Sequence, residues 1–145
     1  MVNLLLTGGN GYIGSKFIEK FNNKYNITCF DTSYYGANDN LEKIVFNTIK
    51  GDIRSFDSQL LDNIDYVVHM AELCNDPLSE FNPSLTQEIN VNATKKFLNL
   101  CNNSRVKKFI YMSSCSVYGF SDESYVDENS NVHGLTAYAD AKIKN

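Results

Sequence analysis

A tyrosine and a lysine near the end of the sequence have the types and the spacing for acid/base chemistry. Tyr138 and Lys142 are four residues apart, so on a helix they lie on one face, about one turn from each other. An ammonium group beside a phenol stabilises the phenolate and lowers the phenol pKa from about 10. We therefore predict that Tyr138 accepts and returns a proton, although two exposed side chains on a surface helix would have the same spacing.

Glycines cluster near the start of the sequence, directly after a short apolar run. Gly8, Gly11 and Gly14 are three residues apart, and the last two also complete a G-x-G-x-x-G pattern. In such a loop one glycine makes the tight turn, one lets the backbone approach a diphosphate, and one allows close packing of helix on strand. The helix then opens at Tyr12 and Ile13, where free amides point at the phosphates. The glycines alone also fit a purely structural turn.

An acidic residue follows this loop at the distance that dinucleotide binding requires. Asp31 lies 17 residues after Gly14, at the end of the next apolar run. A carboxylate at this place accepts hydrogen bonds from both hydroxyls of the adenine ribose and repels a 2'-phosphate. The residue therefore predicts NAD rather than NADP as the cofactor, and the alternative is an aspartate that only forms a turn.

The apolar pattern predicts the strands that must position these side chains. Short runs rich in branched and aromatic residues lie at 2–6, 27–30, 45–49, 66–70 and 108–112. The first run is apolar almost throughout, as in a strand that is buried on both faces. We therefore predict a parallel sheet, with a loop or a short helix at residues 34–43.

Helical periodicity fills the intervals between the strands. Apolar residues recur every four positions in residues 12–23 and again from Leu85 to Cys101, after an Asn82-Pro83 start. Residues 113–136 are polar and rich in turns, and a further helix begins near Tyr138. Strands that alternate with helices predict a doubly wound α/β parallel sheet with strand order 3-2-1-4-5.

Composition limits the classes of protein and partner. The chain has 145 residues, 43% hydrophobic and 21% charged, with a net charge of -4, which fits one globular domain. Its single basic cluster, at residues 105–108, is too small for a nucleic-acid partner. The longest N-terminal apolar run, Leu4 to Leu6, is too short for a signal peptide or a membrane span, so we expect neither. The four cysteines form no metal or disulfide pattern. We expect a cytoplasmic protein.

Six motifs in order along the chain resemble the extended short-chain dehydrogenase/reductase family. The most similar members are its NAD-dependent epimerases and dehydratases, which act on nucleotide sugars. The motifs lie at residues 7–14, 51–54, 69–72, 90–94, 113–119 and 138–142. The resemblance implies a Rossmann fold, NAD as cofactor, a nucleotide sugar as substrate partner and pairing into a homodimer.

The resemblance also implies roles for residues that follow the middle strands. Asp52 and Ile53 would hold the adenine, with a Gly-Asp turn as the alternative for Asp52. Met70 and Ala71, at the end of the fourth strand, would lie beside the cofactor's ribose and diphosphate. Glu72 stands where the family usually carries a small residue. Because a carboxylate repels a diphosphate, we expect Glu72 to point away or to meet a counter-charge.

Two other polar positions are open to two interpretations. Asn90 shares a stripe with Thr86 and Thr94, which fits a solvated helix face; the resemblance instead implies that Asn90 contacts the cofactor or orders the loop beneath the nicotinamide. We interpret His69 as a packed strand residue and place His133 in a loop.

By the same resemblance, Ser114 hydrogen-bonds the reacting oxygen, with Ser113 and Ser116 as substitutes, and Lys142 also binds the nicotinamide ribose. Tyr138 would take a proton from a sugar hydroxyl while NAD takes hydride from the same carbon. Family members that dehydrate a sugar carry an acidic pair at the positions of Cys115 and Ser116, and decarboxylating members carry Glu at the second. The sequence therefore predicts epimerisation or simple oxidation-reduction.

The predicted fold is unfinished at residue 145. A full dinucleotide fold has six strands, and only five are predicted, so we interpret residues 1–145 as an incomplete NAD-binding Rossmann domain without the last strands and the substrate domain. The leading hypothesis is an NAD-dependent nucleotide-sugar epimerase or related oxidoreductase. The alternatives are an NAD(P)-dependent nucleotide-sugar reductase and an inactive dinucleotide-binding regulatory module.

Overall fold

The computed structural model describes residues 1–36, 41, 43–121 and 124–145. Much of the predicted loop or short helix at residues 34–43 therefore lies outside the described residues. The chain forms two compact units. Unit 1 contains Met1–Ala71 and Lys96–Met112, and unit 2 contains Glu72–Lys95 and Ser113–Asn145. Each unit is described by itself below.

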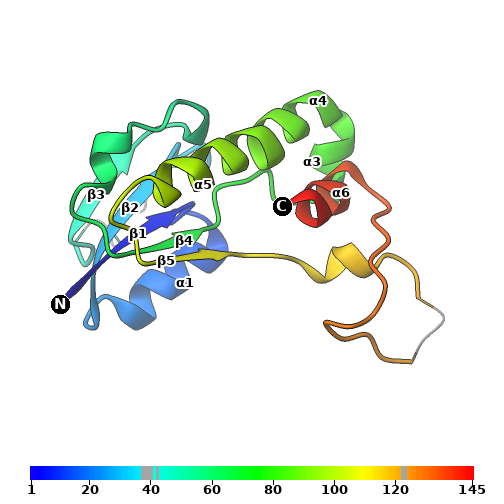
Figure 1. Ribbon diagram of the computed structural model, residues 1–145, viewed down its shortest axis with the longest axis horizontal. Coiled ribbons are helices and arrows are strands. Elements are labelled where there is room, and N and C mark those ends of the chain that lie inside the picture. Colours follow the sequence, from blue (N-terminus) through cyan, green and yellow to red (C-terminus); the bar gives the residue numbers. More distant parts are fainter. Residues whose placement is uncertain (37–40, 42, 122–123) are drawn as a thin grey trace. The chain divides into compact units, whose positions relative to one another are not determined.

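Unit 1 contains a parallel sheet that the described residues build from five strands (Figure 1). The strands are β1 (Val2–Thr7), β2 (Tyr25–Asp31), β3 (Asn47–Lys50), β4 (Tyr66–His69) and β5 (Lys108–Tyr111). Their spatial order is β3-β2-β1-β4-β5, which confirms the predicted order. In the register, Leu4 pairs with Ile27 on one side and with Tyr66 on the other, so β1 occupies the centre.

Both faces of this sheet are covered, as the apolar first strand predicts. On one face Leu4 and Leu6 pack with Ile18 of helix α1 (Tyr12–Phe21), which ends two residues before its predicted end. Because side chains alternate along a strand, the opposite face of β4 presents His69. There the ring of Phe97 packs against His69, 5.3 Å between centroids. Phe97 belongs to helix α5 (Thr94–Asn102). Two 3-10 turns, η1 (Ile53–Ser55) and η2 (Ser58–Leu61), complete the unit.

Unit 2 is helical in its described part. It contains α3 (Asp76–Phe81), α4 (Pro83–Thr86), the π-helix η3 (Gln87–Ala93), the 3-10 turn η4 (Cys115–Tyr118) and α6 (Ala137–Lys144). The predicted helix start is confirmed, since the Asn82 side chain accepts the Leu85 amide at 3.0 Å with Pro83 in the first position. The sequence did not predict the π-helix. Within the described residues no helix is both long and apolar enough to cross a bilayer.

Candidate functional site

The glycine loop after β1 lies against the end of β4. Gly8 has a φ of +76°, and an added Cβ there would lie 2.7 Å from the Met70 carbonyl and 2.8 Å from the Ala71 nitrogen. A side chain at this position would therefore be strained in conformation and would also clash. The close approach needs glycine at residue 8 and brings three predicted cofactor residues together in unit 1.

Two further glycines shape the start of α1. An added Cβ at the buried Gly14 would lie 2.3 Å from the Gly8 carbonyl oxygen, so only glycine lets the helix pack this closely. At Gly11 an added Cβ would meet only that same oxygen, at 3.3 Å. Gly11 is also the N-cap of α1 and provides no capping side chain. The first amides of α1, at Tyr12 and Ile13, are therefore suited to an anion such as a diphosphate.

Asp31 fixes the shape of this loop. Its Oδ2 accepts the Asn10 amide at 2.9 Å, and its Oδ1 accepts the Ser33 amide at 2.7 Å. The Asn10 side chain also donates to the Ser33 hydroxyl at 2.8 Å. Asn10 and Ser33 were missed in the sequence, where an asparagine inside the glycine loop was the only signal. Asp31 thus forms the turn that was the alternative interpretation, and its ribose contact stays a prediction.

Asp52 and Ile53 open the turn η1 at the end of β3. The Asp52 carboxylate accepts the Arg54 amide at 2.9 Å and the Arg54 guanidinium at 2.6 Å. The hydrogen bond from Arg54 holds the pKa of Asp52 below its usual value. Ile53 is buried. The Gly-Asp turn is therefore present, and the adenine contact of both residues stays a prediction.

The end of β4 is organised by Thr7. The Thr7 hydroxyl oxygen accepts the amides of Met70 and Ala71 at 3.2 and 3.3 Å. It also lies 2.6 Å from Nδ1 of His69, whose side chain is fully buried. This confirms that His69 is a packed strand residue. The Thr7 hydroxyl therefore fixes the backbone of Met70 and Ala71, the two residues predicted to lie beside the cofactor.

In unit 2 the start of α6 is fixed to α3 by three hydrogen bonds. The Thr136 hydroxyl donates to Asp76 at 2.6 Å, and the next amide donates to Glu80 at 2.7 Å. The Tyr138 amide donates to the Ser79 hydroxyl at 3.1 Å. Because the amides of Ala137 and Tyr138 are orphan donors of a helix start, their partners on α3 set the position of Tyr138.

Ser114 and Tyr138 are brought together by η4 and α6. Ser114 caps η4 by accepting the Ser116 amide at 3.2 Å, and its hydroxyl donates to the Ser116 hydroxyl at 3.1 Å. A hydrogen bond also joins the side chains of Ser114 and Tyr138. Among the three candidate serines, Ser114 is therefore the one whose hydroxyl contacts the predicted acid/base. Its catalytic role stays a prediction.

Lys142 lies on the same side of α6 as Tyr138, with Nζ 5.5 Å from the centre of the phenol ring. The predicted lowering of the Tyr138 pKa is wrong. Burial raises the pKa of Tyr138 above its usual value; the hydrogen bond of Ser114 lowers it in part, and the Glu72 carboxylate raises it further. The ammonium of Lys142 is paired with Glu72, in a contact whose side chains are 5% and 2% exposed. Glu72 thus meets the counter-charge that the sequence required.

Asn90 is fully buried in the π-helix η3. Its side chain accepts the Leu73 amide and donates to the Leu73 carbonyl, both at 2.9 Å. Thr86 and Thr94 on the same stripe are buried as well, so the interpretation as a solvated face is wrong. Asn90 orders the loop that follows Glu72, while its contact with the cofactor stays a prediction.

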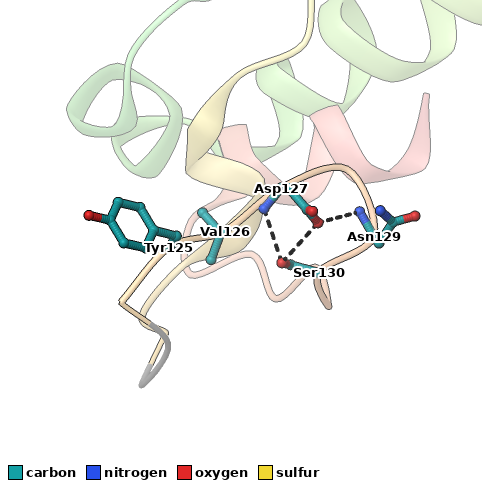
Figure 2. A pocket seen from close by; sticks show the side chains of 5 residues that line it. All are labelled: Tyr125, Val126, Asp127, Asn129 and Ser130. Atoms are coloured by element: carbon teal, nitrogen blue, oxygen red, sulfur yellow. Dashed lines mark hydrogen bonds between the residues drawn. The ribbon is translucent and has the colours of Figure 1, made fainter.

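One hollow in unit 2 lies in the loop between η4 and α6 (Figure 2). It has a volume of about 300 Å³ and is lined by Tyr125, Val126, Asp127, Asn129 and Ser130. Asp127 accepts the Asn129 amide at 2.8 Å, and this bond holds the pKa of Asp127 below its usual value. The described lining includes none of the predicted site residues, and its polar groups bond to one another. We assign no ligand to it.

Comparison with known proteins places this geometry in context. The model of the NAD dependent epimerase/dehydratase family matches residues 4–145. The chain is 35% identical over 143 residues to dTDP-D-glucose 4,6-dehydratase of Dictyostelium discoideum, covering 88% of this chain and 32% of the dehydratase.

Solved structures show the same fold. UDP-N-acetylglucosamine 4-epimerase from Methanobrevibacter ruminantium M1, in complex with UDP-N-acetylmuramic acid, matches with a TM-score of 0.88 and 29% identity over 98% of this chain and 47% of that one. UDP-glucose-4-epimerase from Stenotrophomonas maltophila, with bound NAD and formylated UDP-arabinopyranose, matches with a TM-score of 0.87 and 25% identity over 99% and 46%. The chain spans half or less of the length of each of these relatives.

Proposed function

Because this chain belongs to the NAD dependent epimerase/dehydratase family, we propose that residues 1–145 are the NAD-binding domain of an enzyme that transiently oxidises a nucleotide sugar. The observation that carries the proposal is the hydrogen bond between Ser114 and Tyr138, one helical turn from the buried ammonium of Lys142. These are the groups that a proton transfer at a sugar hydroxyl requires.

The residues of unit 1 fit the dinucleotide. The loop leaves space above Gly11, where an added Cβ would meet only one atom. The uncapped start of α1 offers amides to the diphosphate. Asp31, at the end of β2, would bind the adenine ribose in this proposal, and Asp52 with Ile53 would hold the adenine. Met70 and Ala71 complete the lining on the side of β4.

The residues of unit 2 perform the proton chemistry. NAD, when bound, supplies the acceptor for the hydride from the sugar carbon and later its donor. Ser114 hydrogen-bonds the sugar oxygen. Tyr138, once it has lost its own proton, removes the hydroxyl proton, so that a C–H and an O–H bond break and a ketone forms. Tyr138 gives the proton back when the hydride returns. Lys142 supplies positive charge near the phenol and a donor for the nicotinamide ribose, and Asn90 supports the loop beneath this ring.

Epimerisation is favoured over dehydration by the residues that follow Ser114. Dehydrating relatives carry an acidic pair for the loss of water, and this chain has Cys115 and Ser116 there. Neither side chain is a carboxyl group, so the acidic pair is absent here. We therefore propose the epimerase or a related oxidoreductase, although the dehydratase is among the most similar relatives.

A second candidate is an NAD(P)-dependent nucleotide-sugar reductase. It is favoured by the raised pKa of Tyr138, because a phenol that stays protonated is suited to donate a proton to a carbonyl as hydride arrives. The two candidates differ in their balance of electrons. An epimerase regenerates NAD in each cycle, whereas a reductase consumes the reduced cofactor.

The test is to incubate the intact protein with NAD or its reduced form and a panel of UDP-, GDP- and dTDP-sugars. NMR of the sugar and the absorbance of reduced nicotinamide are then followed together. Inverted sugar without lasting change in cofactor supports the epimerase, and stoichiometric cofactor consumption supports the reductase. Tyr138→Phe should abolish turnover and keep NAD binding. Binding of NAD without turnover of any sugar would contradict both enzymes and support a regulatory module.

A further inference from the structure

Glu72 and Lys142 form a buried ion pair in unit 2, the unit that also contains Tyr138. We propose that Glu72 is a positioning residue that holds the Lys142 ammonium, so that the lysine activates Tyr138 only when it is released from this carboxylate. The inference rests on the proposed function of Tyr138 as the acid/base group. The inference gives a role to Glu72, which was not among the residues predicted to bind the cofactor.

Burial makes the loss of either partner of this ion pair costly. The side chains of Lys142 and Glu72 are 5% and 2% exposed, so water contributes little to the stability of either charge. A buried charge that loses its partner is left with a large uncompensated desolvation cost. Lys142 must therefore keep Glu72 or exchange it for another group that accepts its hydrogen bonds, such as a ribose hydroxyl or a phenolate.

The carboxylate is the fixed member of the pair. Glu72 precedes Leu73, whose amide and carbonyl are both bonded to the buried Asn90 side chain at 2.9 Å. Lys142 carries its charge on a flexible stem of four carbons. The ammonium can therefore move between partners, while the backbone beside Glu72 is fixed by η3.

Tyr138 is the group whose titration should respond to a change in the Glu72–Lys142 ion pair. The ammonium lies 5.5 Å from the centre of its ring. Other titratable groups face the phenol or stand on the elements packed against α6: Cys74 before α3, Asp76 and Glu80 of α3, Glu88 of η3, and Cys115 and Tyr118 of η4. The carboxylate that forms the ion pair with Lys142 in the described part of unit 2 is that of Glu72. Removing the Glu72 charge should leave Tyr138 to neutralise the ammonium.

The experiment titrates Tyr138 in the intact protein without cofactor or sugar. The chain has nine tyrosines, so the phenolate absorbance of each protein is compared with that of the same protein carrying Tyr138→Phe. Glu72→Gln should lower the Tyr138 midpoint by about one pH unit or more, because an opposite charge within 4–6 Å then acts unopposed. Glu72→Asp keeps the charge and should stay near the unsubstituted protein.

Two controls separate positioning from a simple charge effect. Glu128→Gln removes an exposed carboxylate from the loop before α6 and should leave the midpoint of Tyr138 in place. In a Lys142→Met background, Glu72→Gln should give a much smaller shift. An equal shift with and without Lys142, or no shift at all, overturns the proposal, since Glu72 would then not act through the lysine.

A second measurement covers variants that fold poorly. Glu72→Gln and Lys142→Met should each lower the urea midpoint of unfolding, and the double variant should recover part of the loss because no buried charge is left alone. Additive losses overturn the pairing. Since neither measurement uses NAD or a sugar, the inference can fail while the proposed reaction holds, and the reverse is equally visible.

Discussion

The buried side chain of Asn90 bonds to both backbone groups of Leu73, at 2.9 Å each. An asparagine amide is the neutral side chain that offers a donor and an acceptor in one plane, as a peptide group does. The loop between β4 and α3 is thus paired with η3 as if by a short piece of sheet. This relationship gives Asn90 a structural role that precedes any contact with the cofactor.

Asn90→Ala should therefore destabilise the protein by about 2 to 4 kcal/mol, because two backbone groups of Leu73 lose their partners inside the protein. Asn92→Ala is the matched control, two residues along the same π-helix and exposed, and should change stability by no more than about 0.5 kcal/mol. Urea unfolding of both variants measures the difference. Equal stability of the two would contradict the role of the Leu73 contacts.

Asp31→Ala should weaken the binding of NAD by about tenfold or more and the binding of NADP much less. The carboxylate is predicted to accept the ribose hydroxyls of NAD, worth about 1.5 to 3 kcal/mol for a charged hydrogen bond, and to repel a 2'-phosphate. Calorimetry with each dinucleotide measures both effects. Asp57→Ala, which removes an equivalent capping carboxylate from η2, should change neither affinity. If Asp31→Ala weakens both dinucleotides equally, the carboxylate acts only on Asn10 and Ser33.

The sequence predicted the sheet well because its signals are local. Strand β1 is buried on both faces and appears as a continuous apolar run. Glycine is required after it because an added Cβ would lie 2.7 Å from the nearest backbone atom at Gly8 and 2.3 Å from it at Gly14. The Asn82-Pro83 helix start is equally local. The order of the strands then follows from the rules for right-handed crossovers.

The parts that were missed depend on partners distant in the chain. From the sequence alone, the polar stripe through Asn90 fits a helix face exposed to solvent. Only the fold shows that Leu73 is the partner of the buried Asn90 side chain. The pairing of Glu72 with Lys142 joins residues on either side of the fifth strand, and no periodicity encodes it. Burial of the phenol, which also depends on the tertiary fold, raises the Tyr138 pKa, so the predicted direction of this pKa was wrong.

Gly8→Ala and Gly11→Ala should separate folding from binding in the glycine loop. Alanine at residue 8 must adopt a φ of +76° and place its Cβ 2.7 Å from the Met70 carbonyl, so the protein should lose about 2 kcal/mol or more of stability. At residue 11 the backbone φ is -72°, which alanine adopts freely, and the cost should stay below about 1 kcal/mol. The Gly11 variant should nevertheless lose NAD binding, because its methyl group enters the space predicted for the diphosphate. Thermal unfolding and calorimetry on the same samples measure both; tight NAD binding by the Gly11 variant would place the diphosphate elsewhere.

The raised pKa of Tyr138 predicts how stability changes at alkaline pH. The folded protein holds the phenol proton more tightly than the unfolded chain, whose value is about 10. The resulting contribution to stability is fully present below the unfolded pKa and is lost as the pH rises through the folded one. As the pH rises above the pKa of the unfolded tyrosine, the unsubstituted protein should therefore lose unfolding free energy relative to the Tyr138→Phe variant. Ser114→Ala removes a hydrogen bond that lowers this pKa, so it should move the loss to higher pH. Urea unfolding across the alkaline range measures both variants, and a gain relative to Tyr138→Phe as the pH rises would reverse the sign assigned to Tyr138.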